Sequence, residues 1–132
     1  MDLTLFNKEY QHRFVVTQEV YDAFQKCSGD RNPLHTNQEF ALSKGFPECV
    51  MYGNILNGFV SYFIGMLLPS PDVIIHSQDI AYKNPVFLGD ELDFTAKVED
   101  ISEAVKAIIF KFSFRNSSGK IVAKGHVQIG VI

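Results

Sequence analysis

Residues 53–68 read GNILNGFVSYFIGMLL, the most apolar run in this chain. Apolar side chains occur on nearly every side of the helix that this run predicts, so we expect a long central helix buried on nearly every side. The run is shorter than the roughly 20 apolar residues that cross a bilayer, and polar residues interrupt it, so it does not indicate a membrane span. These polar residues, Asn54, Asn57 and Ser61, lie at positions i, i+3 and i+7 and form one stripe along the helix.

The stretches that flank this helix carry strand and short-helix patterns. Alternating or β-branched runs predict strands near residues 12–16, 73–83, 91–98, 104–115 and 121–132, the first of them an edge strand. Before the central helix, Thr17 can cap a helix that Gly29 ends, and residues 38–44 form a second, short one. Residues 30–36 are expected to be a loop, because Asn32 precedes a proline. One long helix followed by antiparallel strands indicates an α+β fold in which the sheet wraps round the helix.

The whole chain is expected to be a single domain, residues 1–132, because this length leaves little room for a second. The formal net charge is −3 and there is no run of Lys or Arg, which argues against nucleic acid and membrane surfaces as partners. The N-terminus lacks the basic and apolar regions of an export signal, so Cys27 and Cys49 are expected to be reduced thiols in the cytoplasm. The histidines are scattered, and no metal-ligand spacing occurs.

The polar stretch SGDRNPLH at residues 28–35 places a carboxylate and an imidazole on one tight turn. Both side chains, Asp30 and His35, can then face one cavity. Such a pair can share a water molecule, with one group accepting its proton and the other delivering a proton to a substrate. The alternative is structural: Asp30 caps the Asn-Pro turn and His35 lies on the surface. The stretch alone leaves both interpretations open.

Two further residues extend this hypothesis into the central helix. The N–H of Gly53 lies at the predicted helix N-terminus, where unpaired amides and the helix dipole can stabilise a developing enolate oxygen. A simple turn between Tyr52 and Asn54 also explains this glycine. Ser61 lies two turns into the helix, and its hydroxyl either orients Asp30 or bonds back to a carbonyl of its own helix.

Separated segments of the chain resemble the MaoC-like branch of the hot-dog fold, the family of (R)-specific enoyl-CoA hydratases. They are DRNPLH at residues 30–35, GF at 45–46, YG at 52–53 and NPVFLGDE at 84–91. The resemblance extends from about residue 16 to residue 132. It implies a curved antiparallel β-sheet wrapped around the central helix, and a homodimer or a higher assembly of dimers.

The resemblance also implies roles for individual residues. Asp30 and His35 would be the catalytic acid–base pair that activates water, and the backbone N–H of Gly53 would bind the thioester oxygen. Ser61 would hydrogen-bond to Asp30 and position it, with Asn32 as a second supporting residue. The reaction would be reversible addition of water to a trans-2-enoyl thioester, giving an (R)-3-hydroxyacyl thioester in fatty acid metabolism. Coenzyme A or an acyl carrier protein would carry the acyl chain, which would lie along the helix, and no metal or other cofactor would take part.

The sequence departs from this family before Gly53, where histidine is common and Tyr52 stands here. Asn57 also departs from the family, because it places an amide where apolar residues are common. Tyr52 and Asn57 are therefore candidate substrate contacts that alter the shape and polarity of the pocket. Two other functions stay open. A hot-dog acyl-CoA thioesterase would direct water at the carbonyl carbon, although the pairing of Asp30 with His35 argues against it. A non-catalytic module would bind an acyl thioester without turning it over.

Overall fold

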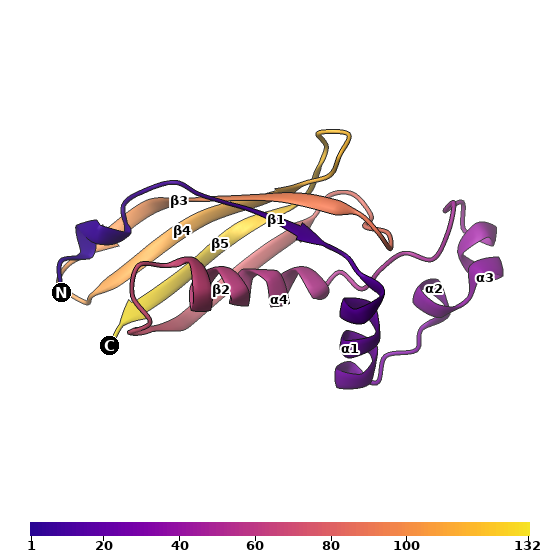
Figure 1. The fold of residues 1–132 in the computed structure, drawn as a ribbon, viewed down its shortest axis with the longest axis horizontal. Helices are drawn as coiled ribbons and strands as arrows, with labels where there is room; N and C mark the ends of the chain where they lie inside the picture. Colours follow the sequence, from indigo (N-terminus) through magenta and orange to yellow (C-terminus); the bar gives the residue numbers. More distant parts are fainter.

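The computed structural model describes residues 1–132 and shows a five-stranded antiparallel sheet with a helix lying along one of its faces (Figure 1). The strands are β1 (Tyr10–Val15), β2 (Val73–Tyr82), β3 (Glu91–Ser102), β4 (Ala107–Arg115) and β5 (Ile121–Val131). Their spatial order is β1-β3-β4-β5-β2, and each neighbouring pair is antiparallel. The predicted α+β arrangement is confirmed, with β1 and β2 as the two edges.

All helical segments lie before β2 in the chain: one precedes β1, and the others lie between β1 and β2. They are η1 (Leu3–Phe6), α1 (Gln18–Ser28), α2 (Pro33–Thr36), α3 (Gln38–Ser43), α4 (Ile55–Tyr62) and η2 (Phe63–Leu67), the last a π-helical turn. The ends of α1 are as predicted: the Thr17 side chain accepts the N–H of Val20, and Gly29, with φ of 71°, closes the helix. No helix has the length and apolar character needed to cross a membrane.

The loop predicted at residues 30–36 is wrong in its second half, where α2 forms one helical turn. Asn32 caps this turn, because its Oδ1 accepts the N–H of Leu34 at 2.9 Å. Pro33 occupies the first helical position, where a proline has no helical hydrogen bond to lose. The Asn-Pro pair therefore starts a helix here.

The core lies between the sheet and the face of the central helix that is turned toward it. Val60 of α4 and Phe63 of η2 are completely buried. The Phe63 ring centroid lies 5.1 Å from that of Phe94 on β3 and 5.2 Å from that of Phe110 on β4. Edge-on and tilted contacts of this kind are favourable for aromatic rings, and they fix the helix against the middle of the sheet.

The opposite face of the central helix is uncovered. Ser61, Tyr62 and Met66 are exposed, and Met66 shows 68% of its surface. The predicted burial on nearly every side is therefore wrong for the single chain. The physical reason is that one sheet curves over only one side of the helix.

The segment from α1 to α3 extends beyond one end of the sheet, away from the two termini (Figure 1). No residue of α1 is buried. An apolar groove of 640 Å³ lies between α1, α4 and β1, and its lining includes the aromatic rings of Phe14, Phe24 and Phe59. The end of the molecule that holds the polar loop is therefore also the end where an apolar ligand can enter.

Candidate active site

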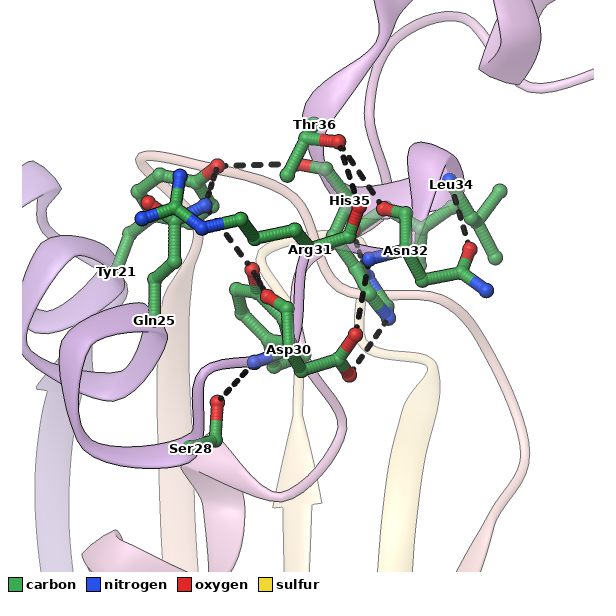
Figure 2. A network of polar contacts seen from close by, with 11 residues as sticks. Tyr21, Gln25, Ser28, Asp30, Arg31, Asn32, Leu34, His35 and Thr36 are labelled. Carbon is green, nitrogen blue, oxygen red and sulfur yellow. Dashed lines mark hydrogen bonds and ion pairs between the residues drawn. The ribbon is translucent and has the colours of Figure 1, made fainter.

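The loop from Ser28 to α2 is built from short side chains that bond to nearby backbone N–H groups (Figure 2). Ser28 Oγ accepts the N–H of Asp30 at 3.1 Å, and Asp30 Oδ1 accepts the N–H of Asn32 at 2.9 Å. Asn32 continues the series by capping α2. Such local bonds are the reason that Ser, Asp and Asn favour turns. They leave Asp30 Oδ2 free to point toward His35.

His35 is held in one orientation by the backbone beneath it. Its Nδ1 lies 2.7 Å from the carbonyl oxygen of Val50, and the Val50 N–H donates to Leu34 O at 3.1 Å. Because a carbonyl oxygen only accepts, Nδ1 carries the proton in this bond. In the neutral ring, Nε2 is then an acceptor.

The structure places Asp30 and His35 side by side, with His35 Nε2 and Asp30 Oδ2 4.0 Å apart. This distance is too long for a direct hydrogen bond. It suits a water molecule that donates one hydrogen bond to each acceptor. The His35 side chain is 17% exposed and that of Asp30 is 45% exposed, so the pair lies at the wall of a site that substrate can reach.

Gly53 lies two residues before Ile55, the first residue of the central helix, and Asn54 between them is the N-cap. Its carbonyl accepts the N–H of Leu56, while its own N–H donates to no acceptor within the chain. The ring of Tyr82 packs against Gly53, and a Cβ atom at this position would lie 3.1 Å from Tyr82 Cε1. The glycine thus keeps a free amide at a helix N-terminus, with little room for a side chain.

Tyr52 connects the loop to the start of the helix. It is 3% exposed, and its ring centroid lies 4.3 Å from that of His35. Its hydroxyl donates to the carbonyl oxygen of Asp30 at 2.5 Å. Through Tyr52 the structure brings Asp30, His35 and the Gly53 amide into one region. Tyr52 stays a predicted substrate contact, and its hydroxyl is bonded within the chain.

Two other predicted residues lie apart from this pair. Ser61 is exposed on α4 and its hydroxyl makes no side-chain hydrogen bond in the single chain, so its bond to Asp30 stays a prediction. Asn57 donates to Asn54 Oδ1 at 2.7 Å and to Tyr82 Oη at 3.2 Å. It therefore belongs to a polar cluster at the start of α4.

The sequence interpretation did not include two residues of α1 that contact the site. Gln25 Nε2 donates to the hydroxyls of Tyr21 at 3.2 Å and Tyr52 at 3.3 Å. The Tyr21 hydroxyl in turn donates to His35 O at 3.2 Å. Burial, with smaller effects of Tyr52 and Cys49, raises the pKa of Tyr21. Their i, i+4 spacing on α1 was the available signal, because such residues share one helix face.

No group of three or more His, Cys, Asp or Glu side chains is arranged to hold a metal ion. The groups that the structure brings together here are a carboxylate, an imidazole and a backbone amide. These three groups can hold water, accept its proton and stabilise negative charge on a nearby carbonyl oxygen.

Comparison with known proteins identifies relatives of the whole fold. A family model described as MaoC like domain matches residues 6–115. An (R)-specific enoyl-CoA hydratase of Rhodospirillum rubrum is 31% identical over 108 residues, which are 82% of this chain and 74% of that protein. An (R)-specific enoyl-CoA hydratase of Aeromonas caviae is 39% identical over 77 residues, 58% of this chain and 56% of that protein. The match to this second relative thus spans little more than half of its length.

Solved structures agree with these matches. An unliganded R-hydratase from Pseudomonas aeruginosa superposes with a TM-score of 0.85 and 26% identity, over 95% of this chain and 80% of that one. The (R)-hydratase from A. caviae superposes with a TM-score of 0.90 over 100% of both chains, and at 23% identity this likeness shows the fold.

Proposed function

Because this chain belongs to the family of MaoC-like domains and has its hot-dog fold, we propose that it adds water reversibly to a trans-2-enoyl thioester to give an (R)-3-hydroxyacyl thioester. Its relatives make it a hydro-lyase of the hydratase and dehydratase class. The resemblance inferred from the sequence is thereby confirmed at the level of family and fold. The (R) configuration comes from the names of the relatives.

The observation that carries the proposal is the 4.0 Å separation of His35 Nε2 and Asp30 Oδ2, with the Nδ1–H of His35 bonded to Val50 O. Two acceptors at this distance orient one water molecule and leave its oxygen lone pairs directed toward a substrate. The hydration reaction needs a nucleophilic water and a nearby base, and this arrangement supplies both.

In the addition, one proton leaves the water molecule and one proton is delivered to the substrate. The water oxygen forms a bond to the β-carbon, the electrons of the carbon–carbon double bond move toward the thioester carbonyl, and the acid–base pair takes one proton from the water. The same pair returns one proton to the α-carbon, so its own protonation is unchanged over the cycle. Dehydration is the reverse sequence through the same groups.

Gly53 would stabilise the enolate that forms between these two steps. Its N–H is free of any acceptor within the chain and lies at the N-terminal end of α4. A preorganised donor of this kind typically contributes about 10²–10³ in rate. The close packing of Tyr82 against Gly53 supports the need for a glycine at this position.

The acyl chain would lie in the apolar groove between α1, α4 and β1. The groove has a volume of 640 Å³ and an aromatic lining that includes Phe24 and Phe59. Phe24 also contacts Tyr52, with ring centroids 5.0 Å apart, so the groove begins next to the acid–base pair. Burial of methylene groups in such a groove contributes about 0.8 kcal/mol each.

A homodimer, or an assembly of such dimers, is proposed because apolar surface is uncovered at one side of the fold. Met66 of η2 is 68% exposed, and Ile74 and Ile75 on the edge strand β2 are 53% and 39% exposed. An edge strand with exposed apolar side chains favours pairing with another chain. The cytoplasmic location stays a proposal, and the two free cysteines, Cys27 and Cys49, are compatible with it.

The carrier of the acyl group would be coenzyme A or an acyl carrier protein, since relatives are named for both. No cofactor is proposed beyond this carrier, because acid–base groups and an amide donor suffice for addition of water to an activated double bond.

Incubation with crotonyl-CoA tests the proposal. We expect the enoyl absorbance to fall without release of free thiol, and the product to be the (R)-3-hydroxy thioester. Release of thiol at the rate at which substrate disappears would instead identify a thioesterase. Saturable binding of the substrate with neither change would identify a non-catalytic binding module.

A further inference from the structure

Tyr52 lies at the centre of a network that joins α1 to the acid–base loop. Tyr21 and Gln25 of α1 approach the loop of Asp30 and His35 from one side (Figure 2). The network has four bonds: Gln25 Nε2 to both tyrosine hydroxyls, Tyr21 Oη to His35 O, and Tyr52 Oη to Asp30 O. Each of the two acid–base residues is thus held by one tyrosine.

The direction of every bond in this network follows from chemistry. The carbonyl oxygens of Asp30 and His35 only accept, so the hydroxyls of Tyr52 and Tyr21 must donate to them. The hydroxyl oxygens are then acceptors, and the Gln25 amide supplies a donor for each. One side-chain amide therefore braces both tyrosines, and the network has a single consistent arrangement of protons.

The ring of Tyr52 adds a second restraint. It packs 4.3 Å from the His35 ring and 5.0 Å from the Phe24 ring between centroids, and Tyr52 is almost fully buried. Together with the bond from His35 Nδ1 to Val50 O, this contact fixes the plane of the imidazole. The aromatic face holds His35, while the hydroxyl at its far end holds the backbone of Asp30.

We infer that Tyr52, braced by Gln25, is a positioning residue that sets the separation of the Asp30 carboxylate and the His35 imidazole. The inference rests on the proposed hydratase function and extends it to a tyrosine where the family commonly has a histidine. Tyr52 acts through Asp30 and His35 and has no direct part in the chemistry. Loss of the Tyr52 hydroxyl is therefore expected to reduce the stabilisation of the transition state more than the affinity for substrate.

The first test is kinetic and uses Tyr52→Phe, which keeps the ring and removes the hydroxyl. We expect kcat for crotonyl-CoA to fall about tenfold or more, with KM changed by less than about twofold, because small misplacements of catalytic groups cost up to about 10²-fold. Gln25→Leu should give a smaller fall of the same kind. The double variant should lose less than the product of the two single effects, since Gln25 acts partly through Tyr52 and partly through Tyr21.

Tyr10→Phe is the matched control. Tyr10 is also buried, and its hydroxyl donates to a backbone carbonyl, that of Phe6, at 2.9 Å. This variant loses the same kind of bond at a place remote from the loop, so its kcat should equal that of the wild type. An equal loss in Tyr10→Phe and Tyr52→Phe would overturn the positioning role.

The second test does not depend on activity. Hydrogen exchange of the amides of residues 29–37 should be about tenfold faster in Tyr52→Phe, while the strands keep their protection. Unchanged exchange in this segment, or faster exchange with an unchanged kcat, would overturn the inference, as would a rise in KM at constant kcat. If the wild type turned over no enoyl thioester but Tyr52→Phe still released the loop, the proposed function would fail while the restraint by Tyr52 stood.

Discussion

His35 donates its Nδ1–H to the carbonyl oxygen of Val50 at 2.7 Å, and this bond decides which nitrogen faces the substrate side. With Nδ1 occupied, the neutral ring presents Nε2 as an acceptor toward Asp30 Oδ2, 4.0 Å away. A backbone carbonyl fifteen positions later in the chain therefore sets the protonation pattern of the imidazole. The bond to Val50 O thus leaves Nε2 as the nitrogen of His35 that can accept a hydrogen bond from the proposed water molecule.

Gly53→Ala tests the proposed oxyanion donor. A Cβ atom would come within 3.1 Å of Tyr82 Cε1, so the ring or the backbone must shift and the approach to the amide narrows. We expect kcat/KM for crotonyl-CoA to fall about 10²-fold. Tyr82 is 48% exposed and its ring can move, so the melting temperature should change little. Unchanged kcat/KM would remove Gly53 from the mechanism.

Met66→Glu and Ile75→Lys test the proposed dimer. Each places a charge on the apolar surface that is uncovered in one chain, at η2 and at β2. The wild type should sediment as a dimer at micromolar concentration, and both variants should shift toward monomer because a charge in an apolar interface is costly. Val105→Lys, at a residue that is 69% exposed in the turn between β3 and β4, is the control. A monomeric wild type would contradict the proposal.

Gly125→Ala tests the packing of the edge strand. A Cβ atom at Gly125 on β5 would overlap the carbonyl oxygen of Asp79 on the paired strand β2. Overpacking of this kind typically costs about 1–3 kcal/mol in the free energy of unfolding, which denaturant titration can measure. Gly58→Ala is the comparison, because its Cβ would meet nothing within 4 Å and alanine favours a helix. Equal stability of the two variants would show that β2 is not tightly packed there.

The sequence predicts correctly those features that depend on a residue and its neighbours in the chain. Alternation marked the four strands after the helix to within a few residues, and Thr17 and Gly29 marked the ends of α1. These features are local, since capping and pleating depend on a few neighbouring residues. The family resemblance, which the comparisons confirm, also depends on local features, because its motifs are short and contiguous.

The features that the sequence does not predict depend on contacts between residues that are distant in the chain. The carbonyl oxygens of Val50 and Asp30 orient His35 and Tyr52, yet backbone atoms have no sequence signature. The bias of Asn32 away from helix, caused by the proline that follows it, predicts a loop but is equally compatible with an N-cap, and Asn32 is the N-cap of α2. Burial of the central helix was overestimated because hydrophobicity alone does not tell whether the same chain or a second one covers a face.

The most direct test of the Asp30–His35 pair compares two histidine variants in the crotonyl-CoA hydration assay. His126 on the outer face of the sheet also lies beside a carboxylate, with Nδ1 3.3 Å from Asp79 Oδ1, and it is the matched control for His35. His35→Ala and Asp30→Ala should each lower kcat by about 10²-fold or more, the usual contribution of a general acid or base, while both stay folded by circular dichroism. His126→Ala should keep the wild-type rate. Near-normal hydration by folded His35→Ala or Asp30→Ala would contradict the account.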